Sequence, residues 1–439
     1  MLIDNALFSV AQGHAFLAGT CGTFVASAKN RGSPPQYGVA PRYKFVVTAW
    51  TVPMISPSSC GLTPPELQKM ISWHLSSAAL KKSATLLPMF PEVAPIRAGE
   101  EIDLRVLGAY LRSKVEGAEA GLTVEQFPGG HSNLTYLVRA GDREYVLRRS
   151  PVGPVAPKAH DMAREFRVLE AVHPVFPPAP RVYVLCEDPA VIGVTFFLME
   201  RRHGVVLRRD VPAEFAHAAG FPRKTSEGFI DCLAQLHAID IERQGLAALG
   251  RPDGFLKRQV CGWTDRWERA KTEELPDMDG LVGWLADRMP ASATPTLVHN
   301  DFKLDNIMLD ARSPGRVEAV LDWEMATVGD PLVDLGCTLC YWTQAGDPEM
   351  RGGSLSGITA EPGWYTRAEL VARYAEKAGR DVSALGYYEV FGLFKLGVIL
   401  QQIYFRFHRG QTRDERFRDF HLRVRGLMHS AVELAERLG

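Results

Sequence analysis

The sequence predicts an α+β protein with two lobes, a small β-rich lobe followed by a larger helical one. Short runs rich in β-branched and aromatic residues lie close together between residues 122 and 200. Beyond residue 200, apolar residues recur mainly at the three- and four-residue spacing of helices. Two short strand candidates, 307–309 and 317–321, lie within the helical part on either side of a Ser-Pro-Gly turn. The length of 439 residues allows roughly two to three domains.

Composition indicates a globular protein with reduced cysteines. The formal net charge is -1, so no overall electrostatic attraction to nucleic acid or to an anionic membrane is expected. Seven cysteines in 439 residues are too few for a disulfide scaffold. The longest apolar run, 390–405, contains Lys395, Gln401 and Gln402 and is shorter than the roughly 20 residues of a membrane span. We therefore expect a cytoplasmic protein that binds neither nucleic acid nor membrane, with a buried helix at 390–405.

Residues 1–95 differ from the rest of the chain. The first 90 residues hold seven Lys or Arg but only two acidic residues, Asp4 and Glu66. Pro and Ser cluster at 33–36 and 55–61, which disfavours a packed core. We predict that residues 1–95 are a disordered extension or are translated from a start upstream of the true one, and a targeting segment is the third alternative.

The small lobe is predicted to span residues 100–200. Apolar residues at helical spacing predict its first helix, and β-rich runs predict five strands, two of them joined by the turn Gly141-Asp142. A second helix, with Met162, Phe166 and Leu169 on one face, separates the third and fourth strands. The expected helices are 102–115 and 159–172, and the expected strands are 122–127, 134–139, 144–148, 181–186 and 191–200.

The larger lobe is predicted to span residues 201–439. Amphipathic periodicity predicts helices at 227–239, 281–288, 367–378, 387–407 and 417–438. Cys337 and Cys340 stand three residues apart on an apolar segment, and no second Cys or His pair lies at zinc-ligand spacing, so core packing is expected for both. Trp263, Trp267 and Trp284 are likewise expected to pack rather than to bind a cofactor.

The residues with chemical potential lie in the segment 297–306, Leu-Val-His-Asn-Asp-Phe-Lys-Leu-Asp-Asn, and in Asp322-Trp323-Glu324, which begins 16 residues after Asn306. Phosphoryl transfer needs a carboxylate that orients the acceptor hydroxyl, and an Asn and an Asp that hold Mg²⁺ against the nucleotide phosphates. The Asp-x4-Asn spacing supplies Asp301 and Asn306, and the hairpin between them and Asp322 returns that carboxylate to the same place. Each residue alone is common by chance, whereas the combination is rare.

At these positions the sequence resembles the aminoglycoside phosphotransferase family of kinase-like enzymes. Its loop has the form His-x-Asp-x4-Asn, and its metal motif is Asp-x-Glu or Asp-x-Gly. The likeness runs from about residue 100 to the C-terminus and includes 321–324 and 329–336, where Asp330 and Asp334 would hold the loop and the helix start by capping. In particular, the chain resembles the branch whose members occur free or fused to acyl-CoA dehydrogenases. The resemblance implies a two-lobed protein-kinase-like fold that binds ATP or GTP with Mg²⁺ between the lobes.

The resemblance also implies roles for individual residues of the large lobe. Asp301 would be the catalytic base, Asn306 and Asp322 the magnesium ligands, and Glu324 a weaker candidate near the metal. Lys303, two residues after the base, is either a catalytic cation that neutralises charge on the transferred phosphoryl group or a solvated loop lysine.

The small lobe would bind the nucleotide. The resemblance places Arg148 over the phosphates with Glu165 on the following helix as its partner, and strand alternation puts Arg149 on the opposite face. Which of the two arginines contacts phosphate stays open. The backbone of Glu200 would meet the adenine at the hinge. A loop between two strands would approach the phosphates through its backbone and is formed by Gly129, Gly130, Ser132 and Asn133.

The sequence therefore predicts an ATP- and Mg²⁺-dependent phosphotransferase that moves the γ-phosphate to a hydroxyl of a small molecule. The likeness to dehydrogenase-fused domains implies a hydroxyacyl-CoA as acceptor and a functional link to acyl-CoA dehydrogenases. The alternatives are an aminoglycoside or another small-molecule acceptor, or a nucleotide-binding pseudokinase or scaffold. The Gly-rich stretch 346–363 is a candidate lid over the acceptor. The sequence does not determine the oligomeric state.

Overall fold

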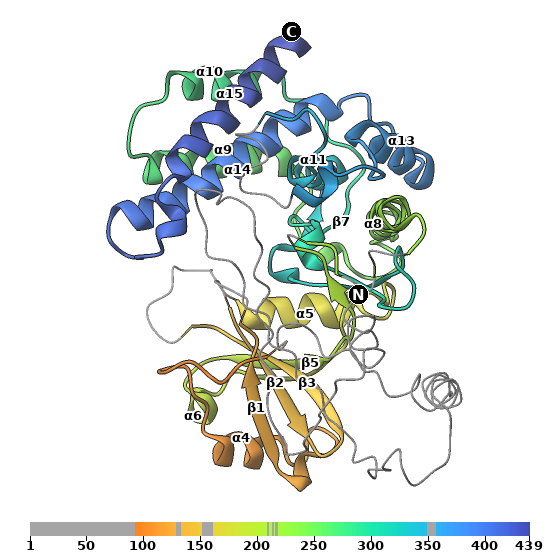
Figure 1. Cartoon of the computed structure of the whole chain (residues 1–439), viewed down its shortest axis with the longest axis vertical. Helices are drawn as coiled ribbons and strands as arrows, with labels where there is room; N and C mark the ends of the chain where they lie inside the picture. The colour runs from red at the N-terminus through yellow and green to blue at the C-terminus, as the bar shows by residue number, and fades with distance from the viewer. Residues whose placement is uncertain are drawn as a thin grey trace, which may run out of the picture. The chain divides into compact units, whose positions relative to one another are not determined.

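The structure is a computed structural model that describes residues 93–128, 133–151, 161–208, 210–212, 215, 218–348 and 357–439 (Figure 1). These residues form a small lobe built on an antiparallel sheet and a larger, mainly helical lobe, as the sequence predicts. Most of the extension predicted at 1–95 lies outside the described residues. Ala94 is described, and it pairs with Gln126 at the edge of the sheet.

The small lobe contains one five-stranded antiparallel sheet with the strand order β1-β2-β3-β5-β4. All five predicted strands are present, and Gly141, with a φ of 57°, lies in the turn between the second and third. Alternate residues of these strands face two buried clusters, one on each side of the sheet. The strands are β1 (Leu122–Gln126), β2 (Leu134–Ala140), β3 (Arg143–Arg149), β4 (Val182–Cys186) and β5 (Phe196–Glu200).

Two predicted boundaries in the small lobe are wrong. The helix predicted at 102–115 is shorter, α4 (Leu104–Leu111), because the carboxylate of Asp103 caps its N-terminus. The strand predicted from residue 191 begins only at Phe196, because residues before it form the short helix α6 (Pro189–Ile192), which is capped by Asp188. The other helix, α5 (Met162–Val172), lies against the sheet and faces the large lobe (Figure 1).

The large lobe contains long helices around a common core. Its helix α9 was not predicted, because Trp263 and Trp267 are buried on a helix whose other faces carry many charged residues. By length and composition α14 could cross a membrane, but 61% of its most apolar 18-residue window is buried inside the protein. The main helices are α8 (Phe221–His237), α9 (Phe255–Ala270), α10 (Pro276–Asp287), α11 (Pro331–Tyr341), α13 (Arg367–Ala378), α14 (Leu385–His408) and α15 (Phe420–Leu438).

Two small sheets of the large lobe flank the segment 297–306. β7 (Thr296–Val298) pairs with β10 (Thr327–Gly329), and the hairpin of β8 (Ile307–Leu309) and β9 (Val317–Val320) pairs with β6 (Val205–Val206). The backbone N–H of Leu321 donates to the carbonyl of Asn306 at 2.8 Å. The hairpin therefore returns the chain to the end of the 297–306 segment, as the sequence predicts.

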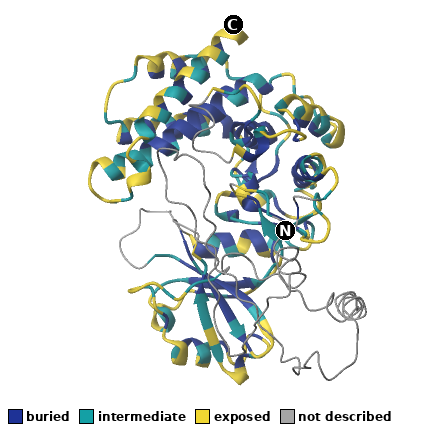
Figure 2. Cartoon of the chain, viewed as in Figure 1, coloured by how far each residue is buried: buried dark blue, intermediate teal, exposed yellow. Residues whose placement is uncertain are grey.

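Most residues of α11 and of the first two thirds of α14 are buried (Figure 2). The two helices cross closely at two glycines. A Cβ on Gly336 would collide with the backbone carbonyl of Tyr388, and a Cβ on Gly392 would lie 2.8 Å from the carbonyl oxygen of Gly336. The two helix backbones can approach this closely only because neither position carries a side chain.

We expect Gly336→Ala to lower the free energy of unfolding by about 1–3 kcal/mol, because the added methyl group forces two backbones apart. Gly280→Ala, in α10, is the matched control: its Cβ would have no neighbour within 4 Å, so it should be neutral or stabilise by up to about 1 kcal/mol. Urea unfolding of both variants measures the difference. Equal stability of the two variants would contradict the close crossing of α11 and α14.

Candidate active site

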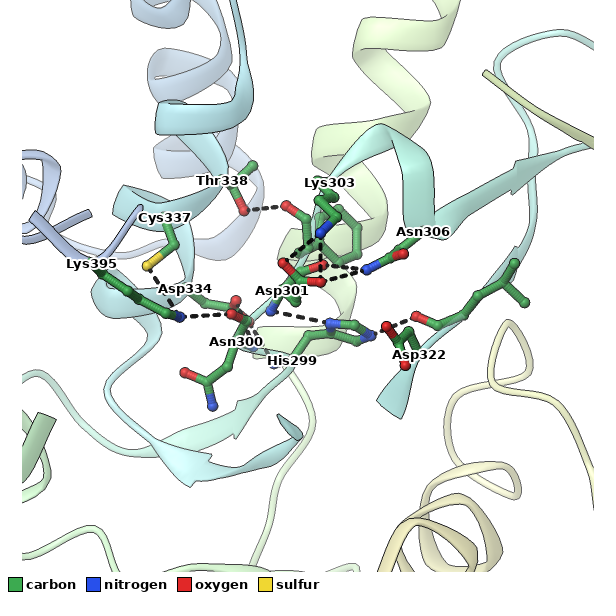
Figure 3. Close-up of polar contacts among 12 residues, drawn as sticks. His299, Asn300, Asp301, Lys303, Asn306, Asp322, Asp334, Cys337, Thr338 and Lys395 are labelled. Carbon is green, nitrogen blue, oxygen red and sulfur yellow. Dashed lines mark hydrogen bonds and ion pairs between the residues drawn. The ribbon is translucent and has the colours of Figure 1, made fainter. Parts of the chain in front are cut away.

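The segment after β7 forms a tight loop around the carboxylate of Asp301 (Figure 3). Nζ of Lys303 lies 3.0 Å from Oδ1 and 2.8 Å from Oδ2 of Asp301, and Nδ2 of Asn306 donates to Oδ2 at 2.9 Å. Nδ2 of Asn306 also donates to the backbone carbonyl of Asp301 at 2.9 Å. These contacts fix the orientation of the carboxylate, and Lys303 contacts the proposed base rather than only solvent.

His299 joins this loop to the end of the hairpin. Its Nε2 lies 3.0 Å from the carbonyl oxygen of Leu321, and its Nδ1 accepts a hydrogen bond from the backbone N–H of Asp301 at 3.3 Å. The buried ring also makes an edge contact with Trp323, with 5.0 Å between the ring centroids. The imidazole thus connects the loop to Leu321, the residue before Asp322, and fixes the distance between them.

Asn300 and Asp322 are the two non-glycine residues with positive φ in the described part of the chain, at 66° and 67°. Such backbone strain persists where the surroundings fix it, and it concentrates at functional sites. For Asn300, the fixing group is the buried carboxylate of Asp334. It accepts the backbone N–H of His299 at 2.6 Å and that of Asn300 at 2.8 Å.

His237 contacts the carboxylate of Asp334. Its Nε2 lies 3.3 Å from Oδ2 of Asp334, and its Nδ1 lies 2.7 Å from the hydroxyl of Tyr374. Burial lowers the pKa of His237, so the ring is neutral and donates from Nε2. Burial alone would raise the pKa of Asp334, but the hydrogen bond and the nearby His237 and His299 hold it below its usual value. Asp334 therefore stays ionised. Asp330 caps α11, as predicted, by accepting from the backbone N–H of Leu332.

Arg148 connects the two lobes. Its guanidinium is 3.2 Å from Glu165 of α5 and 3.0 Å from Oδ1 of Asp322. Burial lowers the pKa of Arg148, but the two carboxylates outweigh this effect and hold it above its usual value. Burial would raise the pKa of Asp322, and the charge and hydrogen bond of Arg148 bring it below the usual value instead. For Glu165, burial outweighs the attraction of Arg148 and the pKa is raised.

Arg149 faces away from this cluster. Its Nη2 donates to the hydroxyl of Tyr136 at 2.8 Å and to the carbonyl of Glu100 at 2.7 Å, within the core on the other side of the sheet. Strand alternation therefore separates the two arginines as expected, and it is Arg148 that lies beside Asp322.

Glu324 lies between the lobes and contacts two small-lobe residues. Its Oε2 accepts from Nδ2 of Asn133 at 2.8 Å, and its backbone carbonyl accepts from Arg164 at 2.7 Å. Burial, with a further effect from Asp322, raises the pKa of Glu324. Asn133, predicted to approach phosphate, thus has a side-chain contact with the 322–324 segment. Gly129, Gly130 and Ser132 lie outside the described residues, as do residues 349–356 of the predicted lid.

A cleft of about 730 Å³ opens beside these groups. This volume is within the range of small-molecule sites. Glu200, at the end of β5, lines the cleft, and its side chain accepts from the backbone N–H of Arg181 and pairs with Arg202 at 3.0 Å. The lining residues from both lobes include Phe127, Arg148, Glu165, Met199, Glu200, Asn306, Met308 and Asp322.

The donor set suits Mg²⁺. Nδ2 of Asn306 points to Asp301, so its Oδ1 is directed away from the base, and Asp322 uses only Oδ1 for Arg148. An amide oxygen and a carboxylate oxygen are hard ligands, and Mg²⁺ typically takes one or two protein oxygens and completes its shell with water and phosphate. Cys337 and Cys340 are both buried, in agreement with the core packing predicted for them.

Sequence reasoning missed two residues next to the loop. Tyr341 lines a smaller cavity with Lys303, whose Nζ lies 4.9 Å from its ring centroid, and burial together with Asp301 holds the pKa of Tyr341 well above its usual value. Lys395 reaches the loop from the centre of α14. Both residues lie outside the motif in sequence. The one signal for them in the sequence is their place on predicted or apolar helical segments.

Comparison with known proteins identifies the family. The sequence model of the phosphotransferase enzyme family (APH) matches residues 123–370, which are more than half of the chain. The chain belongs to this family. The matched range includes every predicted site residue and both sides of the cleft, so the two-lobed, kinase-like fold expected from the resemblance is confirmed.

Several full-length relatives carry a phosphotransferase domain of this family as one part. Acyl-CoA dehydrogenase family member 11 of Rattus norvegicus is 35% identical over 326 residues, which are 72% of this chain and 41% of that protein. Acyl-CoA dehydrogenase family member 10 of Mus musculus is 33% identical over 325 residues, 73% of this chain and 30% of that protein. The chain thus spans less than half the length of these curated relatives.

Solved structures show the same fold. A protein of Ralstonia eutropha assigned to the aminoglycoside phosphotransferases has a TM-score of 0.66 and 31% identity, over 77% of this chain and 99% of that one. Choline kinase of Cryptosporidium parvum has a TM-score of 0.53 and 11% identity, over 76% and 96%. The aminoglycoside phosphotransferase APH(4)-Ia, with a TM-score of 0.50 and 19% identity over 75% and 98%, was solved as a ternary complex with AMP-PNP and hygromycin B.

We expect Asp334→Asn to destabilise the phosphotransferase by about 2–4 kcal/mol, because the amide removes a buried charge that accepts two backbone N–H groups. Asp381→Asn, at an exposed turn before α14, is the matched control and should leave stability unchanged within error. Chemical unfolding measures both variants. A stable Asp334→Asn protein would show that this carboxylate does not hold the loop.

Proposed function

We propose that the chain transfers the γ-phosphate of ATP, in the presence of Mg²⁺, to a hydroxyl group of a small molecule. The observation that carries this proposal is that Asn306, Asp322 and Arg148 line one cleft, while Asn306 also donates to the carboxylate of Asp301. The AMP-PNP found in APH(4)-Ia supports ATP as the donor. In this proposal Asn306 and Asp322 hold Mg²⁺, which would neutralise charge on the phosphates.

Asp301 is the proposed base. Its carboxylate is fixed by Lys303 and Asn306, so an acceptor hydroxyl bound to it would be oriented for in-line attack, and the carboxylate would take its proton as the new P–O bond forms. Lys303 would compensate negative charge that develops on the transferred group. Catalysis would then consist mainly of positioning and charge stabilisation.

The acceptor we favour is a hydroxylated acyl thioester of coenzyme A. The small cavity next to Lys303 is lined by Phe229, Tyr341 and Trp342, with Asp305 as its one acidic residue among the described lining residues. The cavity has a volume of about 20 Å³, so it would receive only the end of an acceptor. Its aromatic wall suits an acyl group, whereas a polycationic aminoglycoside would require several carboxylates there. The relatives named as acyl-CoA dehydrogenases agree with this choice, and a functional link to such an enzyme is part of the proposal.

The decisive experiment measures ADP formation and product mass with hydroxyacyl-CoA thioesters that differ in chain length and hydroxyl position, with sugars, amino alcohols and aminoglycosides as competing acceptors. Asp301→Asn should lower kcat by about 10²- to 10⁴-fold with little change in ATP affinity, because it removes the base and leaves the metal ligands. Asp310→Asn, in the turn of the same hairpin, is the matched control and should keep full activity. Undiminished turnover of Asp301→Asn would refute the assignment, and ATP binding by the wild type without transfer to any acceptor would favour a scaffold.

A further inference from the structure

Lys395 is a buried cation in the middle of α14. The residue is 4% exposed, although lysines are almost never fully buried unless they are paired. Among the described residues, the ion pairs with N–O distances up to 4.0 Å include none with Lys395, so no carboxylate neutralises its ammonium group. Removing a charge from water is costly, and no ion pair offsets that cost here. Packing alone would be served better by an apolar side chain.

The ammonium group ends at the catalytic loop (Figure 3). Nζ of Lys395 donates to the backbone carbonyl of Asn300 at 2.9 Å, lies 3.6 Å from Sγ of Cys337, and is 5.6 Å from the ring centroid of Trp263. The contact with Asn300 is the one short polar contact of the three. It spans 95 positions in sequence and connects α14 to the residue that precedes Asp301.

Cys337 does not act as a counter-ion for Lys395. Burial raises the pKa of the Cys337 thiol, and the opposing effect of Lys395 does not overcome it. The thiol therefore stays protonated and neutral at neutral pH.

Asn300 is held at three points, and Lys395 supplies one of them. Its N–H donates to Asp334 at 2.8 Å, its side-chain Nδ2 donates to the carbonyl of Met325 at 3.0 Å, and its own carbonyl accepts from Lys395. Its φ of 66° lies in the left-handed region, which most non-glycine residues avoid and Asn adopts more readily. A change in that angle would rotate the following peptide and so move the carboxylate of Asp301, the next residue.

We propose that Lys395 is a positioning residue for the base: by holding the Asn300 carbonyl, it locks the peptide that aims Asp301 at the acceptor. This inference rests on the proposed function, in which Asp301 is the base. The two ends of Asn300 are fixed by different helices, by α11 through Asp334 and by α14 through Lys395. The close crossing of those helices at Gly336 and Gly392 keeps the two anchors at constant separation.

The test is Lys395→Met in the full chain. Methionine keeps the length and apolar character of the side chain but removes the charge and the hydrogen bond. We expect the melting temperature to stay within about 4 °C of the wild type or to rise, because a buried charge is replaced by an apolar group. We expect kcat to fall on the order of 10- to 100-fold, with the KM for ATP within about 3-fold, because only the aim of the base is lost.

The matched control is Gln401→Met, also in α14. Gln401 is buried and donates to the carbonyl of Ala270 at 2.8 Å, but it does not contact the catalytic loop. This variant removes a buried polar group from the same helix and should keep the wild-type kcat. If both variants lose kcat and melting temperature in parallel, or if Lys395→Met keeps the wild-type kcat, Lys395 has no positioning role.

Hydrogen exchange separates this inference from the proposed function. In the Lys395→Met protein, the amides of Asn300 and Asp301 should exchange at least about 10-fold faster, while those of β2 and β3 stay unchanged. This readout needs no acceptor. If the wild type phosphorylates none of the acceptors, the proposed function fails, and faster loop exchange still supports Lys395 as the anchor of the loop. Unchanged exchange at Asn300 and Asp301 overturns the inference whatever the activity.

Discussion

The hydrogen bonds from two consecutive backbone N–H groups to Asp334 are the constraint on which the site depends. They hold the backbone of His299 and Asn300 in place, including the positive φ of Asn300. The carboxylate is itself held by a neutral, buried His237, so its position is tied to α8 and α13 as well as to its own helix. Because α11 crosses α14 without room for a side chain at Gly336, a displacement of that contact would move the loop. The orientation of Asp301 is therefore a property of helix packing in the large lobe, although the residue lies in a loop.

A second constraint acts across the cleft. Arg148 is placed between Glu165 of its own lobe and Asp322 of the other, so the separation of the lobes and the position of a proposed metal ligand are coupled through one guanidinium. Breaking a buried pair by removing one partner is costly, because the remaining charge is left without compensation. Glu165 is the member that can give up charge, since burial raises its pKa, whereas Asp322 remains ionised. A planar guanidinium can keep one carboxylate contact and still direct N–H groups toward a phosphate, as the role predicted for Arg148 requires.

The sequence predicted the local elements and the spacing of the motif, because both depend on residues close together in the chain. The five strands, α13 and the hairpin of β8 and β9 follow from periodicity and turn residues, and the polar residues Asp301, Asn306 and Asp322 follow from their separation. Contacts that join distant segments could not be predicted. Nothing in the sequence around Lys395 indicates that its ammonium group donates to the carbonyl of Asn300. Helix α9 was not predicted because its two buried tryptophans lie among charged residues. Val191 and Ile192 were predicted as the start of a strand because β-branched residues favour strands, but they are the last residues of the four-residue helix α6.

The division between local motif and distant contacts also explains why one loop can serve different acceptors. The proposed base and metal ligands come from a single loop and hairpin, so a short motif is enough to specify them. The cavity beside Lys303 is built instead by Phe229 of α8, by Tyr341 and Trp342 at the end of α11, and by Thr359 beyond it. Phe229 lies more than a hundred positions before the other three. These residues lie outside the motif, although Phe229 packs against Phe302 of the loop with 4.9 Å between the ring centroids. The fold shared with choline kinase therefore leaves the acceptor undetermined. Selectivity is expected to follow the aromatic residues of this cavity, because they adjoin Lys303 and thus the carboxylate that would receive the acceptor hydroxyl.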